Sequence, residues 1–233
     1  TDRAAGEAVA QTGRSIARRT LDRIGYRPVP DEGQTTSMLR EQMIWHAAVF
    51  GEKTDLDFAG RQFEALTRGG QVDPNLSKSV LQVAALTRGQ SAFDWFCSSL
   101  ATTGSEHERM NLLAALGCLR DAPLVEKAAR YTLDKVPDRN KFIPLVAMAA
   151  NPHAVPLLWD WYTAHVKALE TMHPLLYERV VGAVIPLAGM QSPDAVRVFF
   201  RDYLQETSLA ADAIRLSLEK LEINLAMREA AKK

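Results

Sequence analysis

The sequence has few of the features by which reactive sites are recognised. Only two of its 233 residues are cysteines, Cys97 and Cys118, and neither has the nearby second cysteine of a metal site. Both lie in apolar helical patterns, so we interpret them as free, buried thiols. No phosphate-binding glycine loop, G-x-S-x-G sequence or convincing catalytic triad is present. The chain is therefore predicted to contain no catalytic residue and no metal or cofactor site.

Net charge and long apolar runs are also missing. Lys and Arg together number 28, as do Asp and Glu, so the formal charge is zero. Binding to nucleic acid depends on excess positive charge, so no nucleic-acid partner is predicted. The longest apolar stretches, 142–150 and 180–190, are shorter than the roughly 18 residues of a membrane-spanning helix. The first residues lack both an initiator Met and a signal-peptide pattern, so we expect a piece of a longer protein.

The sequence also lacks the alternating patterns of β-strands. Helix start and stop signals recur along the chain instead. Segments 65–69 and 85–89 both read Ala-Leu-Thr-Arg-Gly, typical of a helix that ends in a left-handed glycine. Between them, Asp73 and Pro74 form a helix start signal. The two segments are 20 residues apart, the length of one helix and one turn. Two such intervals make a helical pair of about 40 residues, which is the repeat length of helical solenoids. Ser105 and Glu108 have the spacing of a capping box for a further helix.

These signals predict an all-α fold of about eleven antiparallel helices. Pairs of helices are expected to form an α–α superhelix of the HEAT or armadillo kind, with residues 1–233 as a single helical-repeat domain. Helices are expected near 1–24, 36–50, 54–67, 91–102, 123–135, 139–150, 153–169, 173–188, 193–205 and 209–229, and others begin at the start signal of Asp73 and at the capping box of Ser105.

Two features could be mistaken for, or could form, a site. His107-Glu108 begins like the zinc sequence H-E-x-x-H, but Asn111 occupies the second His position, so we interpret the match as chance. A superhelix has a concave face that can bind an extended peptide. The candidate groove or peptide contacts are Arg120, Trp159, Trp161 and Tyr162, although aromatic residues on a helix more often pack between helices. Asn151, at another turn, is interpreted as structural.

Four segments together resemble a known family. They are Ile24-Gly25-Tyr26-Arg27-Pro28 with Glu32 and Leu39-Arg40, Leu112–Cys118 with Asp121 and Leu124, Asn151-Pro152 with Leu158-Trp159-Asp160-Trp161, and Glu219, Leu221, Glu222, Asn224 and Leu225. In this order and spacing they are similar to the C-terminal helical domain of the zinc aminopeptidases that include aminopeptidase N, puromycin-sensitive and endoplasmic-reticulum aminopeptidases. Departures include Tyr26 and Met227, each at a position where the family usually has Trp.

The resemblance implies a role in N-terminal amino-acid removal. In that family a separate, upstream domain holds the zinc and the catalytic residues, so zinc is expected there and not in this chain. The helical domain closes over the catalytic domain and shapes the peptide-substrate cavity. The implied partners are thus an upstream catalytic domain of the same polypeptide and a peptide substrate.

Two other functions stay open at this point. A free-standing helical-repeat scaffold could bind a protein or peptide in its groove, which would fit a complete gene that starts near Thr1. A helical-repeat enzyme acting on nucleic acid would need a one-sided basic groove, and the zero net charge disfavours it.

Overall fold

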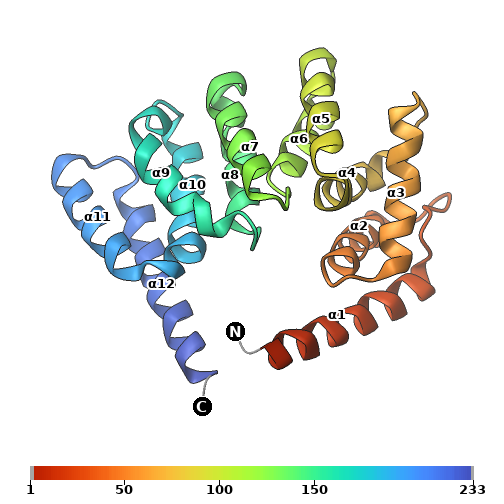
Figure 1. Cartoon of the computed structure of the whole chain (residues 1–233), viewed down its shortest axis with the longest axis horizontal. Helices are drawn as coiled ribbons and strands as arrows, with labels where there is room; N and C mark the ends of the chain where they lie inside the picture. The colour runs from red at the N-terminus through yellow and green to blue at the C-terminus, as the bar shows by residue number, and fades with distance from the viewer. Residues whose placement is uncertain (1–2, 232–233) are drawn as a thin grey trace. The chain divides into compact units, whose positions relative to one another are not determined.

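The computed structural model describes residues 3–231 and confirms the all-α class (Figure 1). This part of the chain forms twelve α-helices and two short 3₁₀ helices, and it contains no strand. The helices are α1 (Arg3–Ile24), α2 (Gln34–Val49), α3 (Lys53–Thr67), α4 (Pro74–Arg88), α5 (Gln90–Thr102), α6 (Glu106–Leu116), α7 (Ala122–Lys135), η1 (Asp138–Asn140), α8 (Phe142–Ala149), α9 (Val155–Leu169), α10 (Pro174–Leu187), η2 (Ala188–Gln191), α11 (Pro193–Glu206) and α12 (Ala211–Ala230).

The chain divides into two compact units after Ala115. In the first unit, α2 packs against both α1 and α4, and α3 packs against α4. Phe63 of α3 meets Trp95 of α5 edge to face, with their ring centroids 5.3 Å apart. The expectation of a single domain over 1–233 stays a prediction.

The loop between α1 and α2 is fixed by one buried arginine. Arg40 of α2 is fully buried, and its guanidinium donates to both carboxylate oxygens of Glu32 at 2.5 and 2.6 Å. The same guanidinium donates to the backbone carbonyls of Gly25 and Ile24 at 2.8 and 3.0 Å. The hydrogen bonds from Arg40 lower the pKa of Glu32 to about 2. A buried guanidinium is stable only when its N–H groups are paired with hydrogen-bond acceptors. This requirement accounts for Arg40 and Glu32, which belong to the first of the segments that resemble the family.

In the second unit, α10 lies between α8 and α12 and packs against both, as Figure 1 also shows. Gly182 of α10 lies beside α12, and a Cβ at that position would be 4.0 Å from the Ser217 hydroxyl, an ordinary van der Waals distance. At the far end of α10, Asn224 of α12 donates from Nδ2 to the Pro186 carbonyl at 2.9 Å. Pro186 lies in the last turn of α10, where backbone carbonyls have no partner within the helix, and Asn224 satisfies this one. This assigns a structural role to the asparagine of the last resembling segment.

Most helix ends agree with the start and stop signals. Asp73 accepts a hydrogen bond from the Asn75 amide at 2.9 Å, and Gly69 has the predicted left-handed φ of 80°. The predicted capping box is half formed. Ser105 accepts from the Glu108 amide at 3.3 Å, but the Glu108 carboxylate accepts from the Thr103 hydroxyl and not from the Ser105 amide.

The largest difference lies in the segment expected as one helix over 139–150. The structure instead has the 3₁₀ helix η1, followed by α8 from Phe142. Pro144 is the reason, because proline is tolerated in the first turn of a helix but not further along it. No helix of the described residues is long and apolar enough to cross a membrane.

Candidate functional site

The turn between α6 and α7, residues 117–121, is held tightly against α8. Gly117 lies so close to this helix that an added Cβ would be 2.4 Å from the Ala147 Cβ and 2.7 Å from the Pro144 carbonyl oxygen. Real Cβ atoms essentially never approach other atoms this closely. Only glycine therefore permits this contact between the turn and α8.

A second clamp on the same turn comes from Asn151, which lies between α8 and α9. Its Nδ2 donates to the carbonyls of Gly117 and Leu119 at 2.9 and 2.7 Å, and its Oδ1 accepts from the His153 amide at 3.0 Å. Asn151 is buried, so no water replaces these bonds. The side chain joins two turns that are more than thirty residues apart in the sequence.

Arg120 extends from this clamped turn. Its side chain is exposed and, among the described residues, takes part in no ion pair or hydrogen bond. The adjacent Asp121 precedes α7 but makes no side-chain capping bond either. The arrangement presents a free guanidinium on a backbone with little freedom to move. Such a group suits the recognition of a carboxylate.

Trp159 and Tyr162, two of the predicted contacts, are enclosed in the second unit. Their exposed fractions are 7% and 1%, and their rings stack with centroids 6.0 Å apart. Both rings also pack against Phe200 of α11. The Tyr162 hydroxyl shares a 2.7 Å hydrogen bond with the Tyr177 hydroxyl, and burial raises the pKa of both phenols above its ordinary value. In this structure the two side chains stabilise the core.

Trp161 lies on a different face of the same helix and is partly exposed. Its ring stacks on His165 at a centroid distance of 4.7 Å, and His165 Nδ1 lies 2.7 Å from the Trp161 carbonyl oxygen. No contact links Trp161 or the two buried rings to Arg120 among the described residues. Of the four predicted contacts, Arg120 and Trp161 are accessible to a ligand, and their role in binding stays a prediction.

No sequence pattern indicated Tyr177 and Phe200, which complete the aromatic core around Trp159 and Tyr162. These residues lie on α10 and α11, and only the packing of three helices brings them to α9. Helical spacing identifies neighbours within one helix, so it could not have indicated this cluster.

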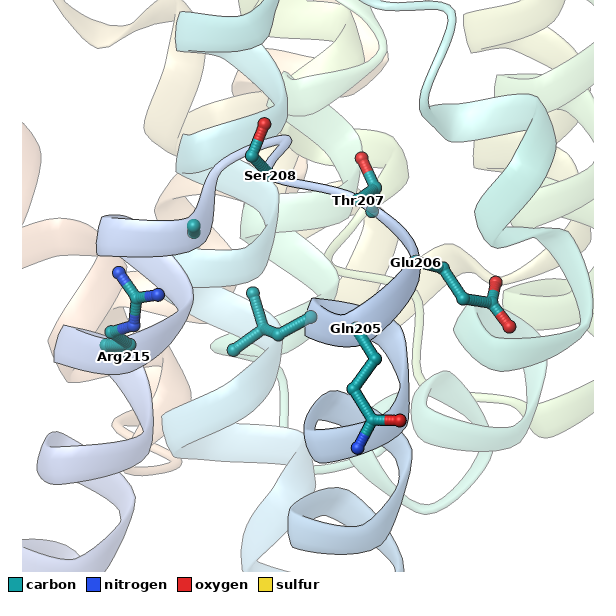
Figure 2. Close-up of a pocket in the computed structure, with 7 residues that line it drawn as sticks. Gln205, Glu206, Thr207, Ser208 and Arg215 are labelled. Carbon is teal, nitrogen blue, oxygen red and sulfur yellow. The ribbon is translucent and has the colours of Figure 1, made fainter.

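A polar pocket of about 270 Å³ lies at the turn between α11 and α12 (Figure 2). Figure 2 shows the Glu206 carboxylate and the Arg215 guanidinium directed away from each other. Arg215 is already paired with Asp212 at 2.9 Å. The pocket therefore has no pair of convergent charges with which to hold a ligand.

No group of three or more His, Cys, Asp or Glu side chains is placed to bind a metal within residues 3–231. The zinc-like sequence beginning at His107 is not a metal site in this structure. The Asn111 amide that replaces the second histidine lies 3.2 Å from His107 Nε2. The donors of this part of the chain do not fit a catalytic zinc ion.

Comparison with known proteins gives one family model and several relatives. The model described as "ERAP1-like C-terminal domain" matches residues 2–223. The chain is 25% identical over 171 residues to "Probable aminopeptidase 2" of Sulfurisphaera tokodaii, which aligns 72% of this chain with 22% of that protein. It is 22% identical over 207 residues to "Alanine/arginine aminopeptidase" of Saccharomyces cerevisiae, covering 84% of this chain and 24% of the relative.

A third relative is "Aminopeptidase M1" of Arabidopsis thaliana, 23% identical over 221 residues. That alignment covers 91% of this chain and 25% of the relative. The chain thus spans about a quarter of the length of the curated relatives it matches.

Proposed function

This chain belongs to the ERAP1-like C-terminal domain family, and we propose that it is the non-catalytic C-terminal domain of a zinc aminopeptidase. In this role it closes over an upstream catalytic domain and shapes the cavity that receives the peptide. The zinc ion and the catalytic residues belong to that other domain. The three relatives support the proposal, because each has the name of an aminopeptidase and is about four times as long as the matched segment.

The side chain of Arg120, which is unpaired within the described residues, is the observation that supports a role in peptide binding. The backbone that carries this free guanidinium is fixed by Asn151 and Gly117, so it loses little further freedom when the guanidinium binds a carboxylate. A peptide carries such a group at its C-terminus and on acidic side chains. We assign to Arg120 an ion pair with the substrate at a distance from the zinc, and to Trp161 a contact with an apolar peptide side chain.

The first experiment is to sequence the gene on the 5′ side of the codon for Thr1. An in-frame H-E-x-x-H sequence with a downstream Glu ligand is the expected result. A start codon next to Thr1, with no catalytic domain in the reading frame, would overturn the proposal and favour the free-standing scaffold.

The second experiment tests Arg120 in the full polypeptide. Arg120→Gln is expected to raise the KM for peptides of about ten residues roughly tenfold, because one charge-assisted hydrogen bond is lost. The KM for a single aminoacyl fluorogenic amide is expected to stay unchanged, since so short a substrate cannot reach a distant arginine.

The control is Arg130→Gln. Arg130, on α7, is also exposed and takes part in no ion pair or hydrogen bond within the described residues. Equal peptide kinetics for wild type and Arg120→Gln would remove Arg120 from the binding surface. Equal losses for both variants would show an effect of net charge alone.

A further inference from the structure

A second pocket, of about 440 Å³, lies entirely within the first unit, whereas Arg120 belongs to the second. One wall is the start of the loop between α1 and α2, and the other is the first half of α3. The lining residues are Gly25, Tyr26, Arg27, Thr54, Phe58 and Arg61. None of them belongs to the candidate site described above.

The walls of this pocket are already fixed in the absence of a ligand. Arg40 holds the carbonyl of Gly25, which has a left-handed φ of 75°. The Tyr26 ring packs on Phe58 with a centroid distance of 5.0 Å, and its hydroxyl donates to Asp55 Oδ2 at 3.3 Å. The loop is thus attached to both α2 and α3, so a ligand would meet a preformed surface.

Two arginines face this pocket from different elements, Arg27 from the loop and Arg61 from α3. Both are exposed, and neither takes part in a hydrogen bond or an ion pair within residues 3–231. This contrasts with Arg40 and Arg88, which pair with Glu32 and Glu64. Two unpaired guanidiniums beside an aromatic surface offer a carboxylate several donors and offer a flat ring a stacking partner.

Acidic residues near the same place limit the charge of a suitable ligand. Burial, followed by the charges of Asp55, Glu52 and Asp22, raises the pKa of the Tyr26 phenol above its ordinary value. These three carboxylates would repel a strongly charged anion such as a nucleoside triphosphate. A ligand with a single negative charge avoids most of that repulsion when the charge lies between the two arginines and the apolar part of the ligand lies near Tyr26 and Phe58.

We propose that this pocket binds a small aromatic monocarboxylate, with the carboxylate between Arg27 and Arg61 and the ring against Tyr26 and Phe58. The proposal goes beyond the C-terminal-domain function and does not depend on it. It assigns a ligand site to the outside of the loop that Arg40 and Glu32 hold in place.

The test is a titration of the chain with N-acetylphenylalanine, followed by NMR shifts of the backbone amides. Saturable shifts are expected around Tyr26 and Thr54. The neutral N-acetylphenylalaninamide is expected to bind at least tenfold more weakly, because the ring is the same and only the charge is removed. Arg27→Gln and Arg61→Gln are each expected to weaken binding of the acid about five- to tenfold.

Arg68→Gln is the matched control, since Arg68 is another exposed arginine without an ion pair, at the end of α3 and outside the pocket. The Arg68→Gln variant is expected to bind the acid with the same affinity as the wild type. The proposal is overturned if the acid and the amide bind equally, or if neither arginine variant binds the acid more weakly than the wild type. It is also overturned if no saturable shift occurs up to roughly 10 millimolar ligand, because a dissociation constant above that concentration is too weak for a specific site.

Discussion

Replacement of Gly117 by alanine tests the central claim about the turn that carries Arg120. The new Cβ would lie 2.4 Å from the Ala147 Cβ, 2.7 Å from the Pro144 oxygen and 2.8 Å from the Met148 nitrogen. Two of these three atoms are backbone, so no side-chain rotation relieves the overlap. The turn must move away from α8, which also lengthens the hydrogen bonds from Asn151. Overpacking of this kind costs roughly 1–3 kcal/mol, and we expect about 2 kcal/mol.

Thermal unfolding followed by circular dichroism measures this cost. For a chain of this size, about 2 kcal/mol corresponds to a decrease in Tm of about 4–8 °C. Gly104→Ala is the control, because Gly104 lies in the exposed loop before α6 and an added Cβ there meets nothing within 4 Å. A Gly117→Ala protein as stable as the wild type would show that the turn is not clamped. Equal losses in the two variants would point to a general effect of glycine.

Three further substitutions test the hydrogen bonds described above. Asn151→Ala leaves two buried carbonyls without donors and is expected to lower the free energy of unfolding by about 2–4 kcal/mol in urea titrations; a loss under 0.5 kcal/mol would contradict the clamp. Tyr162→Phe removes the hydroxyl that pairs with Tyr177 and is expected to cost about 1–2 kcal/mol, and no change at all would mean that the two hydroxyls do not interact in solution. Asp55→Asn is expected to stabilise the chain at pH 8 by up to about 3 kcal/mol, with the gain shrinking as the pH falls towards 4. A gain that does not change with pH would refute the last prediction.

The sign of the Asp55 prediction follows from its surroundings. Asp55 is fully buried, its Oδ1 has no hydrogen-bond partner, and burial raises its pKa to about 6 from 3.8. The folded state therefore binds the proton more tightly than the unfolded chain does. The ionised carboxylate destabilises the fold above pH 6, and this penalty disappears as the pH falls from 6 towards 3.8.

Much of the fold could be predicted because helices begin and end through local interactions. Asp73 with Pro74, and the glycine at position 69, determine their helix ends within a few residues, so the sequence shows them directly. The start of the helix expected over 139–150 was wrong, because Pro144 is tolerated only in the first turn of a helix and α8 therefore begins at Phe142, after η1.

The aromatic candidates show where local reasoning stops. Trp159, Trp161 and Tyr162 are near neighbours on one helix, and their spacing alone does not say which ring faces the core. Only the packing of α10 and α11 against α9 encloses two of them and leaves Trp161 partly exposed. For the same reason, the sequence placed Arg120 on a turn but could not show whether its charge was already paired.

By itself, the sequence determined the helical class, most helix ends and the family resemblance, all of which depend on residues close together in the chain or on the order of short segments. The tertiary structure alone decided the clamp of Asn151 on the turn at Gly117, the burial of Asp55 and the pocket between Arg27 and Arg61. Each of these joins residues from different elements. Their energies depend on distances and solvent exclusion that exist only after the helices have packed.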